Sequence, residues 1–253
     1  MVCPLDLIFK MKYLSFILVI FVGCSSSLLD ESIPLADRLK IGMDLLDQEK
    51  FVKAQGEFKY VLSRGTGTDY GDDAQFFLAE SYFLNQEYML SIQEYENLTR
   101  KMAFSPYFEK SRFRICEAYR IESPNYYNDQ SYTEKALERY REFLDDFPES
   151  ENSQVVTESM NVLRNKLAKK LYETGILYMK MDEFEPARMS FNAVIDQYYD
   201  TDIIEKVHFE VIKSYAKEGN SLKAEKHWVD KGQSYISNEE IINEITELFS
   251  TKE

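Results

Sequence analysis

The sequence contains few of the residues that interrupt helices. Its 253 residues include 9 glycines and 6 prolines, against 18 tyrosines and 17 phenylalanines. A sandwich or barrel of short strands needs many turns, and turns are rich in glycine and proline. The composition therefore favours a helical chain, and its 44% of hydrophobic residues is enough to bury a continuous core.

Residues that carry chemistry are also scarce. The three cysteines are Cys3, Cys24 and Cys116, with no C-x-x-C among them, and the two histidines have no neighbouring set of metal ligands in the sequence. Glycine-rich phosphate loops, G-x-S-x-G and H-E-x-x-H are missing as well. We therefore expect no catalytic residue, no metal and no cofactor, and we expect Cys116 to have a packing role.

Basic runs are missing too, and the net charge is −14. Without a basic patch, nucleic-acid binding lacks its usual electrostatic footprint. Acidity of this kind is more typical of a soluble surface than of a particular substrate.

The N-terminus has the pattern of a secretory signal peptide. Two lysines, Lys10 and Lys12, precede an apolar run over residues 13–22, and Gly23 follows. The run is too short to cross a bilayer as a helix, which needs about 20 residues. Translation from Met1 and translation from Met11 both give such a segment, so the start codon stays open.

The end of this segment, Val22-Gly23-Cys24, resembles the lipobox of bacterial lipoproteins, with Phe21 where those proteins usually have leucine. The resemblance implies that Cys24 becomes the first residue, carries acyl chains such as palmitate, and anchors the protein to an envelope membrane. Residues 25–33 are polar and short, and they are typical of a tether.

A small residue followed three positions later by a large one occurs five times. The small-residue positions are Gly42, Ala79, Cys116, Gly175 and Ile212, spaced 37, 37, 59 and 37 apart. A period of this length indicates a helical solenoid. The spacing of the other core positions, seen for example in Ala54 and Phe58, resembles the tetratricopeptide repeat. We therefore expect an all-α, right-handed superhelical solenoid of five helix-turn-helix repeats.

The third repeat is expanded. Eight extra residues, 122–129, form a predicted loop between its two helices. Fourteen more lie near 150–167, which is about four helical turns and nearly preserves the helix face. We expect lengthened helices on both sides of a turn at 147–150.

In such repeats the first helices line a concave groove, whose expected lining changes along the chain. The N-terminal part is apolar and aromatic, typical of a site for an extended peptide; its candidate residues are Leu39, Met43, Leu46, Phe76, Glu80 and Phe83. The C-terminal part is basic, suited to an acidic partner domain; its candidates are Arg120, Tyr172, Lys180, Lys206, Phe209, Lys213 and Lys217. The alternative, left open, is that neighbouring helices or a terminal segment cover these residues.

A lipobox, the segments 36–42 and 51–54, and an enlarged third repeat with residues 136–144 and 147–150 together resemble the BamD family of outer-membrane assembly lipoproteins. The resemblance implies a non-catalytic scaffold, anchored in the outer membrane and mostly facing the periplasm. Its implied partners are the periplasmic domains of a barrel-forming subunit, other assembly lipoproteins and the C-terminal segments of unfolded outer-membrane proteins.

The expected organisation follows these features. It comprises a signal peptide (1–23), a lipidated tether (24–33), repeats 1 and 2 (34–107), the expanded repeat 3 (108–150), repeats 4 and 5 (151–236) and a C-terminal capping helix (237–253). Two other functions stay open: a different repeat lipoprotein that coordinates cell-wall or division complexes, and a glycan-binding surface lipoprotein.

Overall fold

The structure, a computed structural model, describes residues 32–65 and 67–250. The expectations on the signal peptide, on Cys24 and on most of the tether lie outside these residues. Within them all regular structure is helical. The helices are α2 (Leu35–Asp47), α3 (Phe51–Gly65), α4 (Gly71–Leu84), α5 (Tyr88–Lys101), α6 (Phe108–Glu122), α7 (Ser131–Asp146), α8 (Ser153–Lys180), α9 (Phe184–Gln197), α10 (Ile204–Lys217), α11 (Ser221–His227), the π-helix η1 (Trp228–Gly232), α12 (Gln233–Tyr235) and α13 (Glu239–Ser250).

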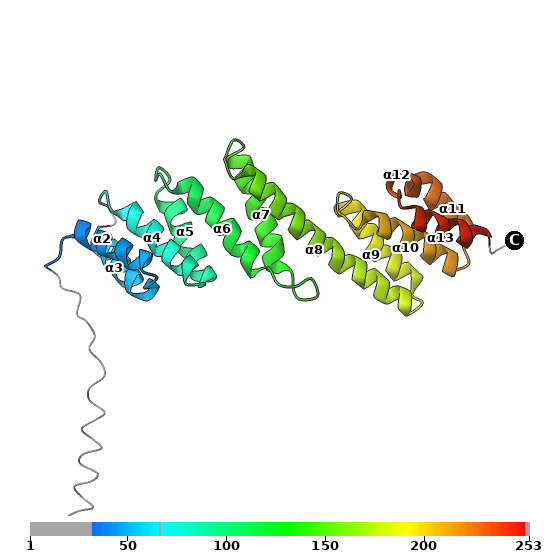
Figure 1. The fold of residues 1–253 in the computed structure, drawn as a ribbon, viewed down its shortest axis with the longest axis horizontal. Helices are drawn as coiled ribbons and strands as arrows, with labels where there is room; N and C mark the ends of the chain where they lie inside the picture. Colours follow the sequence, from blue (N-terminus) through cyan, green and yellow to red (C-terminus); the bar gives the residue numbers. More distant parts are fainter. Residues whose placement is uncertain (1–31, 66, 251–253) are drawn as a thin grey trace, which may run out of the picture.

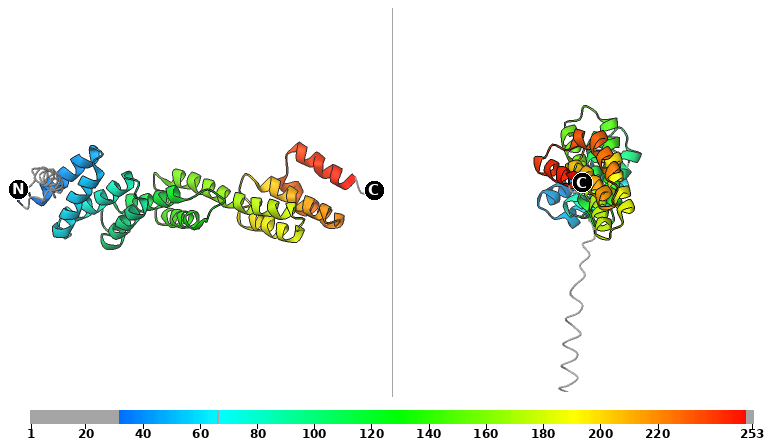
Figure 2. Two further views of the ribbon diagram at one scale, coloured as in Figure 1. Left: turned by 90° about the horizontal axis from the view of Figure 1, so that it is seen from below. Right: turned by 90° about the vertical axis from the view of Figure 1, so that its right-hand side faces the viewer.

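Each helix packs on the helices before and after it, from α2 to α11, so the chain builds a row of antiparallel pairs. Figure 1 shows the row as an elongated rod with its two ends far apart, and Figure 2 shows the same rod from below and along its length. This arrangement confirms the predicted all-α solenoid of five helix-turn-helix repeats. Because each pair touches only its neighbours, the core is a chain of apolar clusters instead of one centre.

Close approach inside a pair depends on the small residues of the repeat. In the first pair, a Cβ on Gly42 would lie 2.6 Å from Cε1 of Phe58, a ring with no exposed surface. Gly175 meets Phe191 in the same way in the fourth pair. The aromatic ring of the second helix therefore fills the space that the first helix leaves open.

We expect Gly42→Ala to lower the free energy of unfolding by about 1 to 2 kcal/mol, because the added methyl must displace a fully packed ring. Gly56, on the neighbouring helix α3, is the matched control, since a Cβ added there meets nothing within 4 Å. Gly56→Ala should raise the free energy of unfolding by about 0.5 to 1 kcal/mol through helix propensity alone. Urea denaturation measures both, and equal shifts for the two variants would contradict the packing argument.

The turns inside the pairs share one backbone device. Four of the five place a residue in the left-handed region two positions before the second helix begins: Glu49, Gln86, Asp182 and Gly219, with φ between 58° and 85°. The third pair lacks this turn, because a long loop stands there at residues 123–130, one position later than the predicted 122–129. That loop packs on α8, where Lys166 Nζ donates to Ser123 Oγ at 2.7 Å and Lys170 Nζ donates to the Asn128 carbonyl at 2.7 Å.

The expectation of lengthened helices on both sides of the 147–150 turn is wrong for one side. Helix α7 has 16 residues, close to the 14 of α5 and α9, whereas α8 has 28. All 14 extra residues therefore extend α8, the long diagonal helix of Figure 1, whose first part packs on α7 and whose second part packs on α9. Extending one helix adds whole turns without creating further helix ends, whose unpaired backbone groups would need partners.

The C-terminal end is closed by α13, which packs on α10. Ile245 of α13 lies in one apolar cluster with Phe209 and Ile212 of α10. Among the described helices, none combines the length and the apolar character that a membrane crossing requires.

Candidate functional site

Half of the predicted peptide-groove residues are buried. Leu39 and Glu80 are 7% exposed and Phe76 is 1% exposed. The ring of Phe76 stacks on Tyr107, at the start of the next repeat, with ring centroids 4.3 Å apart. The interpretation that these three residues line an open groove is therefore corrected: Phe76 and Glu80 contact the next repeat, and Leu39 belongs to the apolar cluster shared by repeats 1 and 2.

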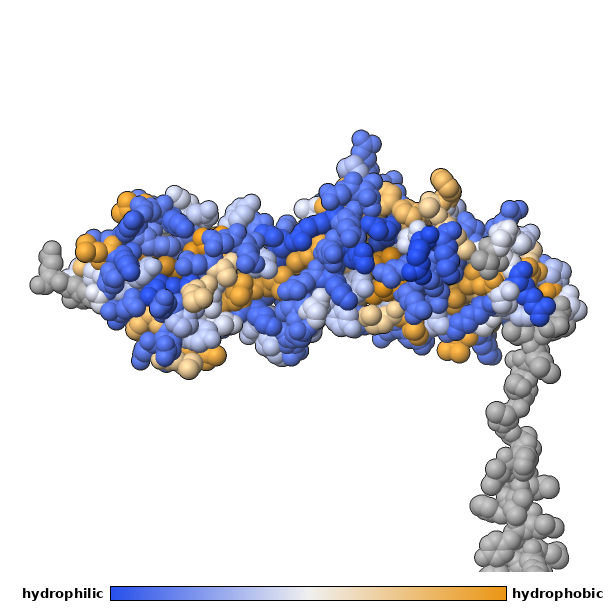
Figure 3. Space-filling view, turned by 180° about the vertical axis from the view of Figure 1, so that it is seen from behind, coloured by the Kyte–Doolittle hydropathy of each residue, from blue (hydrophilic) through white to orange (hydrophobic). Residues whose placement is uncertain are grey.

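The other three groove candidates keep accessible surface. Met43 is 37% exposed, and Leu46 and Phe83 are half-buried. The guanidinium of Arg114 lies 4.7 Å from the centre of the Phe83 ring, so one face of that ring is already covered. On the molecular face shown in Figure 3, hydrophobic residues form separate small areas among hydrophilic ones.

The predicted partner-docking residues differ in accessibility. Lys180, Lys206 and Lys217 are exposed, and Tyr172 and Lys213 are half-buried. Phe209, by contrast, is 8% exposed and belongs to the cluster with α13, so its expected access to a partner is corrected. Arg120 pairs with Glu117 on its own helix, Nη2 to Oε2 at 2.6 Å.

Glu80 does not line a groove but connects three helices through buried hydrogen bonds, an arrangement called here the Glu80 joint. Its Oε1 accepts hydrogen bonds from Tyr95 Oη on α5 at 2.5 Å and from Arg114 Nε on α6 at 2.8 Å. Arg114 Nη2 donates to the second oxygen at 3.1 Å, which completes a bidentate pair. Tyr95 has no exposed surface, and burial together with the Glu80 carboxylate keeps its pKa far above the usual value.

The same joint recurs one repeat later. Glu117 lies 37 residues after Glu80 and accepts a hydrogen bond from Tyr140 on α7. Its guanidinium comes from Arg120 of the same helix, because the next repeat places an acid, Glu173, where Arg114 would correspond. The Glu80 joint thus links repeats 2 and 3, while the Glu117 joint lies within repeat 3.

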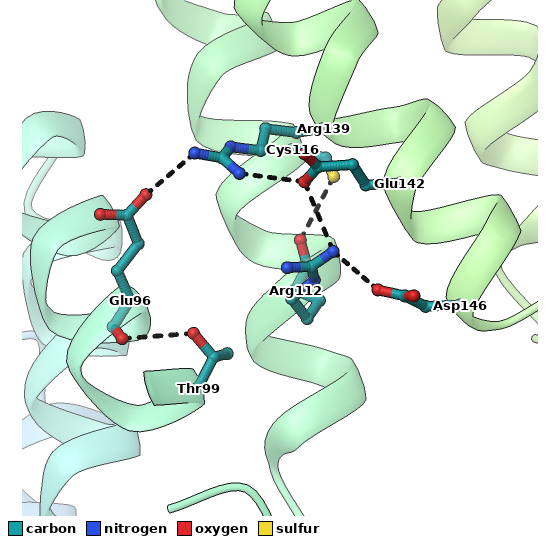
Figure 4. Close-up of polar contacts among 7 residues, drawn as sticks. All are labelled: Glu96, Thr99, Arg112, Cys116, Arg139, Glu142 and Asp146. Carbon is teal, nitrogen blue, oxygen red and sulfur yellow. Dashed lines mark hydrogen bonds and ion pairs between the residues drawn. The ribbon is translucent and has the colours of Figure 1, made fainter. Parts of the chain in front are cut away.

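A second polar network joins α5, α6 and α7 (Figure 4). Arg112 Nη2 lies 2.8 Å from Asp146 Oδ2 and 3.4 Å from Glu142 Oε2. Arg139 Nη1 lies 2.9 Å from the same Glu142 oxygen, and its Nη2 lies 3.5 Å from Glu96 Oε1 on α5. One carboxylate is therefore shared by two guanidiniums.

A cavity of about 320 Å³ opens beside this network. Its lining residues come from α5, α6 and α7: Glu96, Thr99, Arg100, Phe108, Arg112, Ile115 and Arg139. Three of the seven are arginines and one, Glu96, is an acid, on a chain that is acidic overall. We did not predict this site, because its residues lie on second helices as much as on first helices. The sequence signal that could have predicted it is Arg139, because the equivalent position of repeats 1 and 2 carries a glutamate, Glu57 or Glu94.

Cys116 lies under the same network as a buried, free thiol whose Sγ donates to the Arg112 carbonyl at 3.2 Å. Burial raises its pKa to about 12, so the reactive thiolate is essentially absent at neutral pH. In a chain that begins at Ser25, where Cys116 is the only cysteine, we expect no labelling by N-ethylmaleimide under native conditions and full labelling in concentrated guanidinium chloride. Rapid native labelling, followed by mass spectrometry, would contradict the packing role.

No group of three or more histidine, cysteine, aspartate or glutamate side chains suited to a metal ion occurs among residues 32–65 and 67–250. The two histidines contact each other, His208 Nδ1 to His227 Nε2 at 3.0 Å, between α10 and α11.

Known proteins are similar to this chain in sequence. The family model described as YfiO, outer membrane lipoprotein, matches residues 36–229. The outer membrane protein assembly factor BamD of Rickettsia prowazekii (strain Madrid E) is 26% identical over 236 residues, which cover 88% of this chain and 91% of that protein.

Solved structures with repeats are similar at lower identity. MamA from Desulfovibrio magneticus RS-1, from its residue 41 on, is 10% identical with a TM-score of 0.37, covering 87% of this chain and 97% of its own. The thermophilic repeat protein TTC0263 of Thermus thermophilus is 14% identical with a TM-score of 0.37, covering 86% and 100%. At these TM-scores the two structures add nothing to the fold described above. The family match, by contrast, spans well over half of the 253 residues, from α2 to the start of η1, and the chain therefore belongs to the YfiO family of outer membrane lipoproteins, the BamD type.

Proposed function

We propose that this protein is a non-catalytic scaffold lipoprotein of the outer-membrane β-barrel assembly machinery. The observation that carries the proposal is the family match over residues 36–229. A relative named as an outer membrane protein assembly factor, which aligns with this chain along nearly its whole length, supports it. An extended row of helix pairs supports such a role, because it offers a long surface on which several partners can bind side by side.

In this proposal two parts of the surface bind different partners. The exposed lysines of the C-terminal half, Lys180, Lys206 and Lys217, dock on acidic periplasmic domains of the barrel-forming subunit. Met43 and Phe83, in the N-terminal half, contact apolar side chains of unfolded outer-membrane proteins. The charge contrast supports this division, since complementary charges steer and orient protein partners.

Acylated Cys24 anchors the scaffold in the outer membrane, and the repeats face the periplasm. The segment between Cys24 and α2 is short, so the first repeat stays close to the membrane surface. Substitution of Cys24 by alanine should release the protein from the membrane fraction, and an unchanged distribution would contradict lipid anchoring.

Affinity capture from detergent-solubilised membranes tests the scaffold role. We expect the barrel-forming subunit to co-purify with the lipidated protein, and much less of it to co-purify when Lys180, Lys206 and Lys217 are changed together to glutamate. A matched variant changes the exposed lysines Lys40, Lys53 and Lys101 to glutamate and should bind normally. Recovery of cell-wall enzymes in place of a barrel assembly subunit would overturn the proposal.

A further inference from the structure

The arginine-lined cavity arises from a change of residue type at one repeat position. Four positions before the small residue, the first helices carry Arg38, Gln75 and Arg112, each 37 residues from the next. In the first two repeats this donor meets a glutamate 19 residues later. Arg38 Nη1 lies 2.7 Å from Glu57 Oε2, and Gln75 Nε2 donates to Glu94 Oε2 at 2.8 Å.

The third repeat breaks this rule. With its eight extra loop residues, the position that corresponds to Glu57 and Glu94 is 139, which is an arginine. Arg112 and Arg139 are therefore two donors where the earlier repeats place a donor and an acceptor. Carboxylates from elsewhere compensate: Glu142 and Asp146 come from further along α7, and Glu96 comes from the preceding repeat.

The compensation is incomplete on the side of the cavity. Glu96 is the only acid among the lining residues, against three arginines, and its contact with Arg139 is the longest of the network at 3.5 Å. Arg100 donates to the neutral amide oxygen of Asn97 at 2.7 Å, and it belongs to none of the ion pairs recorded for the described residues. The cavity wall thus carries more guanidinium than carboxylate.

We propose that this cavity binds a carboxylate side chain from an acidic segment of a partner protein. The carboxylate enters between Arg100 and Arg139 and takes the place of Glu96, while Phe108 and Ile115 contact its methylene groups or an apolar neighbour. The inference rests on the proposed scaffold function for the existence of a partner, and on the charge and lining of the cavity for its chemistry.

The surroundings favour a carboxylate over a phosphate. The contacts that Arg112 and Arg139 already make are to carboxylates, whose planar shape matches the guanidinium fork. Glu142 and Asp146 lie next to the cavity arginines and repel a doubly charged anion more than a singly charged one. A volume of about 320 Å³ suits one or two side chains.

The test uses the full processed chain and a fluorescent hexapeptide with two central glutamates flanked by phenylalanines, with binding followed by anisotropy. We expect salt-sensitive binding that is at least tenfold weaker for the same peptide with glutamine in place of glutamate. Arg100→Gln and Arg139→Gln should each weaken binding about tenfold. Arg141→Gln, on the exposed side of the same helix α7, should change it less than twofold.

Glu96→Gln is the decisive variant, because it removes the internal competitor. It should strengthen binding of the glutamate peptide several-fold, an effect that general loss of structure cannot produce. Equal binding of the glutamine peptide, unchanged binding by Arg100→Gln, or displacement of the peptide by inorganic phosphate at micromolar concentration would each overturn the proposal. These outcomes concern the cavity alone, whereas failure to capture a barrel assembly subunit would contradict the scaffold function.

Discussion

Replacing Glu80 with alanine is expected to lower the free energy of unfolding by about 3 kcal/mol. The change removes the carboxylate that accepts the hydrogen bond of the buried Tyr95 hydroxyl and that pairs with Arg114. In the variant, the partly buried guanidinium lacks its carboxylate and the buried hydroxyl lacks its acceptor. Neither group is hydrated in the folded protein, so the cost of removing each from water is no longer offset. Because the joint connects α4, α5 and α6, the loss should reach both repeats.

Urea denaturation and hydrogen exchange measure this effect. Protection of α4 and α6 amides should fall together, since both helices are held by the same carboxylate. Glu138→Ala, on the exposed face of α7, is the matched control and should change stability by less than about 0.5 kcal/mol. In a double-mutant cycle, Glu80→Ala and Tyr95→Phe should be strongly non-additive, and simple additivity would show that the two side chains are not coupled.

Lowering the pH from 7 to 5 is expected to reduce the free energy of unfolding by about 2 kcal/mol through His208 and His227, after allowing for screening at the solvent-facing edge of His227. His208 has no exposed surface, and its ring stacks on Tyr235 with centroids 4.6 Å apart. Burial lowers the pKa of each ring to about 4, helped at His208 by the charge of His227 and at both rings by the charge of Lys231.

The sign of this dependence follows from the proton balance. Unfolded histidine has a pKa near 6.5, so below that pH the unfolded chain takes up protons that the folded pair refuses. The stabilising contribution is complete above about pH 6.5 and is lost as the pH falls toward about 4. Because the pair joins α10 to α11, the C-terminal repeat should open first.

A graft from another repeat provides the control. Gln75 and Glu94 occupy in repeat 2 the positions that His208 and His227 occupy in repeat 5, since both pairs are 19 residues apart. His208→Gln with His227→Glu should therefore keep the helix contact while removing the titration between pH 7 and 5. If the double variant loses stability over this range as steeply as the parent protein, the histidine pair is not the cause.

The sequence predicted the helices and their partners well, because periodicity and small residues act locally. Gly42 and Phe58 identify two helices that must touch, and the structure places them in contact. The eight-residue loop was equally clear, since a proline and two asparagines disfavour a continuous helix there.

The exposed face of each pair could not be predicted in the same way. Periodicity gives the apolar side of a helix, but both the interior of a pair and the seam between pairs are apolar, so Phe76 fits a groove and a seam equally well. Phe209 depends on where a distant segment, α13, folds back. The arginine cavity depends on charges from three helices, and its register appears only after the loop insertion is subtracted.

The length of α8 has a mechanical consequence. At 1.5 Å per residue its 28 residues form a strut of about 42 Å that is shared by repeats 3 and 4. Elsewhere a turn between repeats can absorb a small rotation, but a continuous helix transmits it. A tilt of about 5° at one end of such a lever moves the other end by about 4 Å. A force that a bound partner exerts on the N-terminal repeats would therefore rotate the C-terminal repeats.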